Sequence, residues 1–333
     1  ESVMKQTYTN WELCLVDDCS TMESVRDVLH SYENKNDSRI KIAYIILCHK
    51  NANQINKLIK KLNLENCDFF LHIDKKSSIE EDIIKNNHIF ILPNDKRVDV
   101  KWGDISMIEA TVNLMESVFA SKTKYDYIWL ISGQDFPLKS SQEINDFLEK
   151  NKGKNFIEIN RFKEENTIKK RYELYFPNWM RSKNFFIKCL KMGYINIALH
   201  LGNLLDRKNI LNVDFYYGSQ WWTLTYECAK EIYDILLKGE YIDYYKGSLV
   251  PDESIFQTIY MNSRFKDEYY DKLTYVNWEG QTNHPKTFTI EDNDELKNVN
   301  YLMARKFDED FDNKIIDYLV DEFKKSNGID LKT

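Results

Sequence analysis

Glycine and proline are scarce in this sequence. Only 10 of its 333 residues are glycine and 5 are proline, and no stretch concentrates them, so we expect no low-complexity linker. Long apolar runs are missing too, and none is long enough to span a bilayer. No secretory signal peptide is recognisable. These absences predict a cytoplasmic protein.

Metal-binding and disulfide patterns are also lacking. The six cysteines contain no Cys-x-x-Cys pair, which disfavours a disulfide framework or a zinc site. His49, His72 and His284 lie near predicted loops but lack metal-ligand spacing. Positive charge is not in excess either: the formal net charge of −7 argues against a general nucleic-acid-binding protein. The cysteines are Cys14, Cys19, Cys48, Cys67, Cys189 and Cys228.

The remaining composition is that of a globular protein. Hydrophobic residues make up 43% and charged residues 30% of the chain, and its length allows one large or two ordinary domains. Aromatic residues are abundant at 14%. Tyrosine and tryptophan rings stack on sugars and bases, but they also fill cores, so both explanations stay open.

Strand and helix patterns alternate from residue 41 onward. Apolar runs at 42–47, 69–73 and 88–92 predict strands, separated by predicted helices, which is how a nucleotide-binding α/β half begins. Apolar residues spaced 3-4-3-4 predict a helix over 105–119, with Asp104 as its cap. We also expect a helix near residues 80–85, a strand over 155–159 and a closing amphipathic helix that carries Phe311. We therefore expect an α/β domain over 41–333, with a mostly parallel sheet flanked by helices.

The stretch 125–140 is the first candidate site. Its apolar run at 127–131 predicts a buried strand, and a polar turn with Gln134 and Asp135 follows. Ligands of open α/β sheets bind beyond the carboxyl ends of strands, so these two side chains are candidates for sugar binding. The alternative is an ordinary turn in which Asp135 makes a local hydrogen bond.

Three features of the second half allow alternative explanations. Residues 178–211 mix basic and apolar side chains, which suits a peripheral contact with an anionic membrane or a helix packed on the domain. Trp221 and Trp222 either offer a face to a sugar ring or pack in the core. Asp252 begins a predicted helix, where a plain cap is one possibility.

Residues 1–40 resemble a different family from the rest of the chain. A predicted strand at 11–16 runs into Val-Asp17-Asp18-Cys-Ser-Thr. This is similar to the first βα unit of a bacterial family of inverting glycosyltransferases, in which such an aspartate helps to hold the nucleotide. The preceding strand is missing, so we interpret 1–40 as a truncated remnant ahead of the main domain.

Four blocks in the main domain share a second resemblance. They are HIDKK (72–76), WGDISMIEA with LISGQDFPLKS (102–140), GSQWW with PDESIFQT (218–258), and HPKTF with ARKFD (284–308). In this order they resemble the core-2/I-branching β-1,6-N-acetylglucosaminyltransferase family, which includes peptide xylosyltransferases, and most closely its bacterial branch. The resemblance implies a GT-A type fold and inverting transfer from a UDP-sugar without a bound metal.

Transfer without a bound metal ion requires another source of positive charge for the leaving group. UDP gains negative charge as it departs, and a divalent ion or fixed Lys and Arg side chains must stabilise it. Three Asp-x-Asp spacings occur, but all lie late in the chain and are typical of caps and turns. The resemblance places Lys306 at the diphosphate, with Lys286 as the candidate upstream partner and Arg305 beside it. No cofactor is therefore expected.

The resemblance also implies the other roles. Glu253, in the Pro-Asp-Glu motif, would be the general base that takes the proton of the acceptor hydroxyl. Asp74 would hold the uridine, and Glu158 would contact the acceptor sugar. The expected function is transfer of a sugar, N-acetylglucosamine or xylose, to a hydroxyl of a surface glycan. The alternatives are a non-catalytic nucleotide- or glycan-binding protein and a glycoside hydrolase that pairs Asp135 with Glu253.

Overall fold

The chain divides into two compact units, residues 1–39 and 40–333. The computed structural model describes residues 40–162, 168–176, 187, 190–194, 196–197, 210–280 and 284–326, with side chains up to 321. All of these belong to the second unit. Asp17, Asp18 and most of the basic stretch 178–211 lie outside the described residues, so their predicted roles stay predictions.

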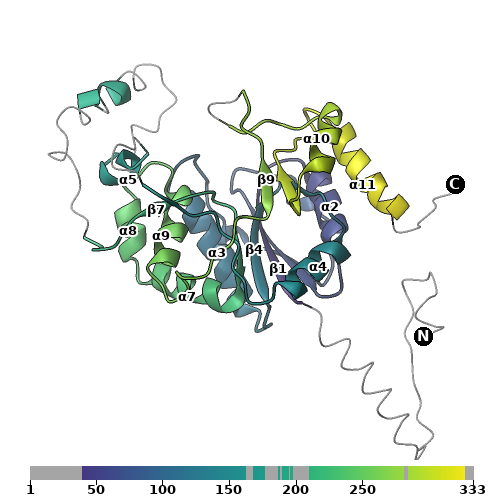
Figure 1. Ribbon diagram of the computed structural model, residues 1–333, viewed down its shortest axis with the longest axis horizontal. Coiled ribbons are helices and arrows are strands. Elements are labelled where there is room, and N and C mark those ends of the chain that lie inside the picture. The colour runs from purple at the N-terminus through teal and green to yellow at the C-terminus, as the bar shows by residue number, and fades with distance from the viewer. Residues whose placement is uncertain are drawn as a thin grey trace, which may run out of the picture. The chain divides into compact units, whose positions relative to one another are not determined.

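A mixed and mostly parallel sheet forms the centre of the domain (Figure 1). Its strand order is β3-β2-β1-β4-β8, with only β8 antiparallel to its neighbour. From β1 the chain continues to β2 and β3 on one side of β1, and it later returns to form β4 on the other side. The strand order therefore changes direction between β1 and β4, which is the topological switch point of the sheet. The strands are β1 (Ile42–Cys48), β2 (Cys67–Ile73), β3 (Ile89–Ile91), β4 (Tyr127–Ser132) and β8 (Thr223–Thr225).

Helices cover both faces of this sheet, as Figure 1 shows. The helices on one face are α2 (Ala52–Leu62), α4 (Ser141–Lys150), α10 (Asn293–Asn298) and α11 (Lys314–Ser326). Those on the other face are α3 (Ser106–Ala120), α7 (Tyr226–Leu237), α8 (Glu240–Tyr245) and α9 (Ile255–Met261). A short helix, α5 (Lys170–Glu173), lies at the edge of the cleft described below. The predicted α/β class and flanked sheet are confirmed.

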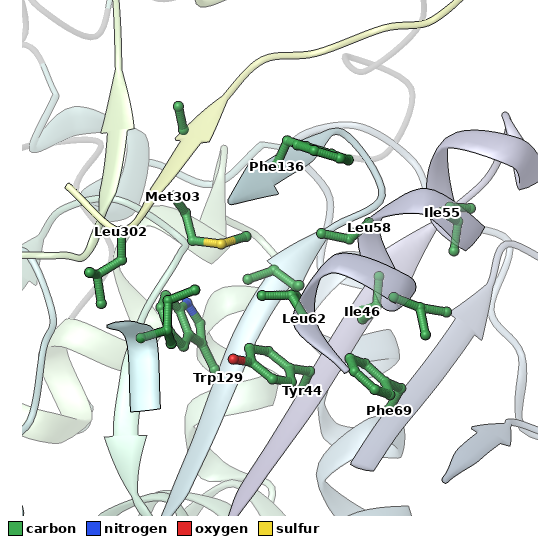
Figure 2. Packing of buried hydrophobic residues seen from close by; sticks show 14 of the residues in the cluster. Tyr44, Ile46, Ile55, Leu58, Leu62, Phe69, Trp129, Phe136, Leu302 and Met303 are labelled. Atoms are coloured by element: carbon green, nitrogen blue, oxygen red, sulfur yellow. The ribbon is translucent and has the colours of Figure 1, made fainter. Parts of the chain in front are cut away.

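Successive side chains of a strand point to opposite faces of the sheet, so each strand contributes to the hydrophobic core on either face. Ile42, Tyr44 and Ile46 of β1 face α2, whereas Ala43, Ile45 and Leu47 face α3. Figure 2 shows the α2 side, where the Tyr44 ring stacks between Phe69 at 5.4 Å and Trp129 at 5.6 Å between ring centroids. Because every residue of β1 is buried, the strand had to be a continuous apolar run.

Two short sheets accompany the central one. The first joins β5 (Asp135–Pro137), β10 (Met303–Arg305) and β9 (Thr274–Val276) in the order β5-β10-β9. The second pairs β6 (Asn160–Arg161) with β7 (Tyr216–Tyr217). Since β5 directly follows β4, Arg305 in β10 comes to lie opposite Asp135.

Three predicted elements differ from the structure. The helix expected near residues 80–85 is a single 3₁₀ turn at Ile79–Asp82, with no buried residue to hold it. The strand expected over 155–159 is reduced to isolated bridges at Phe156. Phe311, expected on the closing helix, precedes α11 and is 68% exposed. Within the described part of the chain, no helix is long and apolar enough to cross a membrane.

Candidate active site

A cavity of about 650 Å³ opens at the carboxyl ends of β1, β2 and β4. Lys50 follows β1, Asp74 follows β2, and Gln134 follows β4, and all three line the cavity. Glu253, Arg305 and Lys306 approach from the second half of the chain. The cavity therefore occupies the position at which open α/β sheets bind ligands, beside the turn that the sequence indicated.

Glu253 is presented by a strained turn. It ends the 3₁₀ turn η5 (Pro251–Glu253), and the residue before this turn, Val250, has φ 51° and ψ 53°. A β-branched residue rarely adopts this left-handed conformation, which costs about 1–3 kcal/mol. The Val250 amide donates to the Gly103 carbonyl oxygen at 3.1 Å, and the Tyr172 hydroxyl donates to the Val250 carbonyl oxygen at 3.4 Å. These contacts hold the turn in place.

Arg171 determines the electrostatics of Glu253. Its Nη1 lies 3.3 Å from Glu253 Oε2, and both side chains line the cavity. Burial raises the pKa of Glu253, the charge of Arg171 opposes that rise, and the carboxylate of Glu158 adds to it. The Glu253 side chain is still 39% exposed, so it remains accessible from the cavity. A raised pKa suits a general base that works near neutral pH.

Asp252 is not the helix cap that the sequence suggested. Its side chain caps no helix, and its Oδ1 is buried without a hydrogen-bond partner among the described residues. Burial, and then the neighbouring charge of Glu253, raise the pKa of Asp252 to about 7. The cavity thus holds two adjacent carboxyl groups, and of these two only Glu253 has a cationic partner within 4 Å among the described residues.

Gly218, in the loop before β8, lies against the backbone of both Glu253 and Glu158. Its amide donates to the Glu253 carbonyl oxygen at 2.9 Å. A Cβ at this position would lie 2.0 Å from the Glu158 carbonyl oxygen, so only glycine allows the approach. Glu158 itself pairs with Lys272 and accepts from Asn160 Nδ2 at 3.1 Å. The glycine therefore keeps Glu158 close to the candidate base.

Lys306 contributes a cation to the cavity wall. Its side chain lines the cavity, and no hydrogen bond or ion pair engages it among the residues that the structure describes. Burial lowers the pKa of Lys306, the carboxylate of Asp308 opposes this, and the positive charges of Arg305 and Lys50 add to it. An unpaired cation beside other cations is an anion-binding arrangement.

Arg305 is held by two of the other predicted site residues. Its guanidinium carbon lies 4.2 Å above the centre of the Trp221 ring, and its Nε lies 3.5 Å from Asp135 Oδ1. Two of its buried nitrogens, Nε and Nη1, donate no hydrogen bond within the described part of the chain. Burial lowers the pKa of Arg305, while Asp135 and Asp252 raise it. Trp221 thus supports a cation on one of its faces.

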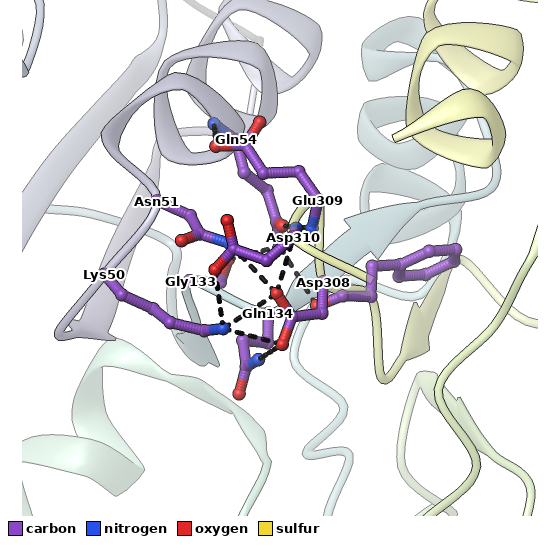
Figure 3. Close-up of polar contacts among 9 residues, drawn as sticks. Lys50, Asn51, Gln54, Gly133, Gln134, Asp308, Glu309 and Asp310 are labelled. Atoms are coloured by element: carbon purple, nitrogen blue, oxygen red, sulfur yellow. Dashed lines mark hydrogen bonds and ion pairs between the residues drawn. The ribbon is translucent and has the colours of Figure 1, made fainter. Parts of the chain in front are cut away.

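A polar cluster connects the segment after Lys306 to the residues that follow β1 (Figure 3). Lys50 Nζ donates to both carboxylate oxygens of Asp308, at 2.8 and 2.7 Å, and to Asp310 at 3.1 Å. The buried Gln54 donates to the carbonyl oxygen of Gly133 at 2.7 Å and accepts from the Glu309 amide at 2.9 Å. These bonds fix the segment that carries Lys306 above the β1 and β4 turns.

Asp74 lies on the part of the cavity wall that follows β2. Only 7% of the residue is exposed, and its oxygens accept from the backbone amides of Lys76 at 2.9 Å and Val100 at 3.3 Å. Next to it, His72 accepts from the Val98 amide through Nε2 at 2.9 Å, and burial lowers the pKa of His72 to about 4. The imidazole is therefore neutral near pH 7 and shapes the loop that carries Asp74.

Three predicted site residues do not line the cavity. Asp135 is fully buried and accepts from the Ser132 amide at 2.8 Å and hydroxyl at 2.9 Å, so the local-bond alternative describes it better than sugar binding. Trp222 is buried against Phe256, as the core alternative predicted. Lys286 pairs with Asp292 at 2.6 Å and Glu295 at 3.3 Å instead.

These positions also bear on the hydrolase alternative. A glycosidase needs two carboxyl groups on either side of one bond in the substrate. Asp135 reaches no substrate position, because it lies beneath Arg305 and is 0% exposed. The burial of Asp135 therefore disfavours the alternative in which it pairs with Glu253 in hydrolysis.

Sequence reasoning missed several residues of the cavity wall. Trp102 and Trp278 line it and are 77% and 51% exposed, which is unusual for rings of this size. Arg171 and Lys50 were not assigned roles either. The signal for Arg171 was its basic, aromatic surrounding sequence, but its partner Glu253 lies too far along the chain to be paired from the sequence.

The Asp-x-Asp spacings serve local structure. Asp312 accepts from the Lys314 amide at 2.7 Å at the start of α11, and Asp292 accepts from the Thr289 amide at 2.8 Å. Asp308 and Asp310 both accept from Lys50. Among the described residues, no group of three or more His, Cys, Asp or Glu side chains is arranged to hold a metal ion.

Comparison with known proteins settles the family. The model of the Core-2/I-Branching enzyme family matches residues 42–299, which contain the sheet and most of the cavity wall. The chain belongs to the core-2/I-branching enzyme family. Its GT-A type α/β fold is therefore the expected one. A second model, glycosyl transferase family 2, matches residues 1–75 and so extends the N-terminal resemblance through β2.

Relatives within the core-2/I-branching family include two kinds of transferase. The chain is 25% identical over 252 residues to Xylosyltransferase oxt of Drosophila pseudoobscura pseudoobscura, covering 72% of the chain and 26% of that protein. It is 23% identical over 251 residues to beta-1,3-galactosyl-O-glycosyl-glycoprotein beta-1,6-N-acetylglucosaminyltransferase 4 of Mus musculus, covering 74% and 52%. The chain spans between about a quarter and a half of the length of these relatives.

Proposed function

We propose that this chain transfers a sugar from a UDP-sugar to a hydroxyl of a glycan acceptor, with inversion and without a metal ion. The observation that carries the proposal is that one cavity is lined both by Glu253 and by Lys306, whose side chain has no partner among the residues that the structure describes. Family membership supports glycosyl transfer, and the relatives' names favour N-acetylglucosamine or xylose as the sugar donated.

The chemistry needs a base and an anion site. Glu253 takes the proton of the acceptor hydroxyl as its oxygen attacks the anomeric carbon from the face opposite UDP. The bond from that carbon to the diphosphate oxygen breaks, and its electron pair leaves with UDP. Lys306, with Arg305 beside it, stabilises the charge that develops on the diphosphate. Fixed cations of this kind are what a metal-independent transferase requires in place of a divalent ion.

The lining of the cavity suggests how the substrates lie. Asp74 would hold the uridine, because it lines the cavity directly after β2, a strand of the nucleotide-binding half. Glu158 and Gln134 would contact sugar hydroxyls, and the exposed rings of Trp102 and Trp278 offer faces on which a sugar can stack. We further propose a bacterial surface glycan, such as capsule or lipopolysaccharide, as the acceptor.

A screen of nucleotide sugars tests this function. Purified protein is incubated with UDP-N-acetylglucosamine, UDP-xylose, UDP-glucose or UDP-galactose, and UDP release and thermal stabilisation are measured for each. We expect one donor to raise the melting temperature and to release UDP. Thermal stabilisation by UDP without release across a panel of acceptors would instead favour a non-catalytic binding protein.

A further inference from the structure

Lys50 and Lys306 both line the cavity, but they differ in their partners. Lys50 Nζ donates to both carboxylate oxygens of Asp308, at 2.8 and 2.7 Å, and to Asp310 Oδ2 at 3.1 Å (Figure 3). Among the described residues, no hydrogen bond or ion pair engages the side chain of Lys306. The charge of Lys50 is therefore met within the protein, whereas the charge of Lys306 is available to a ligand.

The carboxylate of Asp308 is held from two turns of the central sheet. Besides Lys50, it accepts from Asn51 Nδ2 at 3.0 Å, after β1, and from Gln134 Nε2 at 3.3 Å, after β4. The Asp310 amide donates to its Oδ1 at 3.3 Å within the same segment. Burial raises the pKa of Asp308, but the hydrogen bond and the charge of Lys50 outweigh burial and lower it. Asp308 is thus a fixed and charged group.

The segment that contains Asp308 also determines where Lys306 lies. The Phe307 amide donates to the Gln134 carbonyl oxygen at 2.9 Å. The Lys306 amide donates to the Lys286 carbonyl oxygen at 3.3 Å, while the ammonium of Lys286 forms ion pairs of its own. Lys306 therefore lies two residues before an anchored carboxylate, on a backbone that is itself held to the turn after β4.

The charged groups around Lys306 act on it in opposite directions. Burial lowers the pKa of Lys306, the carboxylate of Asp308 raises it, and the charges of Arg305 and Lys50 lower it further. His49 also interacts with Lys306, but burial and then the charge of Lys50 lower the pKa of His49, so this imidazole is neutral near pH 7. Asp308 thus supports the charge of Lys306, and Lys50 opposes it.

We propose that Asp308 and Lys50 are positioning residues for Lys306. Asp308 holds the Lys306 segment on the turns after β1 and β4 and stabilises the ammonium form of Lys306. Lys50 neutralises Asp308 and Asp310, whose carboxylates would otherwise repel an anionic ligand beside Lys306. This inference rests on the proposed function for the ligand, a diphosphate, but the coupling among the three side chains is a property of the protein without ligand.

Titration of the Lys306 amine in the ligand-free protein tests the coupling directly. Nuclear magnetic resonance follows the protein with isotope-labelled lysine, and the Lys306 signal is identified by its loss in Lys306→Arg. Lys50→Met removes a positive charge, so the Lys306 signal should titrate at higher pH than in the wild type. Asp308→Asn removes a negative charge, so the signal should titrate at lower pH. The double variant removes both charges and should titrate between the two.

A second lysine–aspartate pair provides the matched control. Lys57 in α2 pairs with Asp317 in α11, and neither side chain lines the cavity of the candidate site. Lys57→Met and Asp317→Asn make the same changes in charge and should leave the titration of Lys306 as it is in the wild type. Lys50→Gln and Asp308→Ser repeat the two charge changes with other side chains, and should shift the signal in the same two directions.

The pH profile of UDP release shows whether the coupling acts on transfer. The alkaline limb of kcat/KM should move to higher pH in Lys50→Met and to lower pH in Asp308→Asn. A limb that moves in neither variant, or Lys306 signals that shift no more than in the control pair or both shift in one direction, would overturn the positioning role. Opposite shifts of the signal in a protein that releases no UDP would leave the coupling standing and count against the transferase proposal alone.

Discussion

Arg171 and Glu253 form an ion pair on the wall of the cavity, with Arg171 Nη1 3.3 Å from Glu253 Oε2. The pair joins the short helix α5 to the strained turn η5. Burial alone would raise the pKa of Glu253 further, so Arg171 keeps the carboxylate ionised at a lower pH than burial would allow. The acid limb of the pH profile of kcat/KM should therefore report the pKa of Glu253.

Replacing Arg171 should shift that profile. In Arg171→Met the positive charge is gone, the pKa of Glu253 rises, and the acid limb of kcat/KM moves to higher pH. Arg171→Lys keeps the charge and should shift the limb less. The measurement is UDP release from the active donor across a pH series. An acid limb that stays at the wild-type pH in Arg171→Met would mean that another group controls it.

The alkaline limb should belong to Lys306. Burial lowers the pKa of Lys306, so this lysine loses its charge at a lower pH than an exposed lysine does. Because kcat/KM reports the free enzyme, its value should fall as Lys306 deprotonates. In Lys306→Arg, whose guanidinium stays charged, the fall should move to higher pH. An unchanged alkaline limb in this variant would contradict the assignment.

Two lysines that the family resemblance placed together should now behave differently. Lys306→Ala removes a cation of the cavity wall and should lower kcat by about 10²- to 10³-fold. Lys286→Ala removes a lysine that pairs with Asp292 and Glu295 outside the wall, and its activity should stay close to that of the wild type. Steady-state kinetics of both variants test this difference. An equal loss of kcat in the two variants would indicate that Lys286 also contacts the diphosphate.

Gly218 should tolerate no side chain. In Gly218→Ala the new Cβ would meet the Glu158 carbonyl oxygen at 2.0 Å, which we expect to lower the free energy of unfolding by about 3 kcal/mol. Gly193→Ala is the matched control, because Gly193 is helical and its Cβ would meet nothing within 4 Å. Chemical denaturation measures both. A Gly218→Ala protein as stable as Gly193→Ala would show that the approach is looser than described.

Chelation tests the proposed independence from metal ions. Since Lys306 and Arg305 are the charges proposed to meet the diphosphate, EDTA should leave the rate of UDP release unchanged. The assay compares activity after EDTA treatment with activity after EDTA followed by excess Mg²⁺ or Mn²⁺. Loss of activity with EDTA and its recovery with either ion would contradict the proposal.

The sequence predicted the elements whose signal is local. The strand at Tyr127–Ser132 and the helix at Ser106–Ala120 were expected at 127–131 and 105–119, because a buried run and a 3-4 spacing identify such elements on their own. The helix predicted near residues 80–85 is only a 3₁₀ turn at Ile79–Asp82, because this segment packs no apolar face and a helix that short is not stable by itself.

The site was harder to predict because its contacts join distant segments. Asp135 turns inward to Arg305, and Glu253 turns toward Arg171, and neither partner can be chosen from spacing along the chain. Trp221 and Trp222 are adjacent and equally aromatic, yet only Trp221 lines the cavity, since successive side chains of an extended segment point to opposite sides. Motif resemblance indicated Glu253 and Lys306, both of which line the cavity, whereas packing decided which neighbours accompany them.

The central claim is that Glu253 is the base of a sugar transfer. Glu253→Gln keeps the size of the side chain and removes its basicity, and Glu240→Gln makes the same change on an exposed residue of α8. UDP release from the active donor and acceptor should fall about 10²- to 10⁴-fold in Glu253→Gln and stay unchanged in Glu240→Gln, while both variants still bind UDP. A Glu253→Gln protein with full activity would contradict the account.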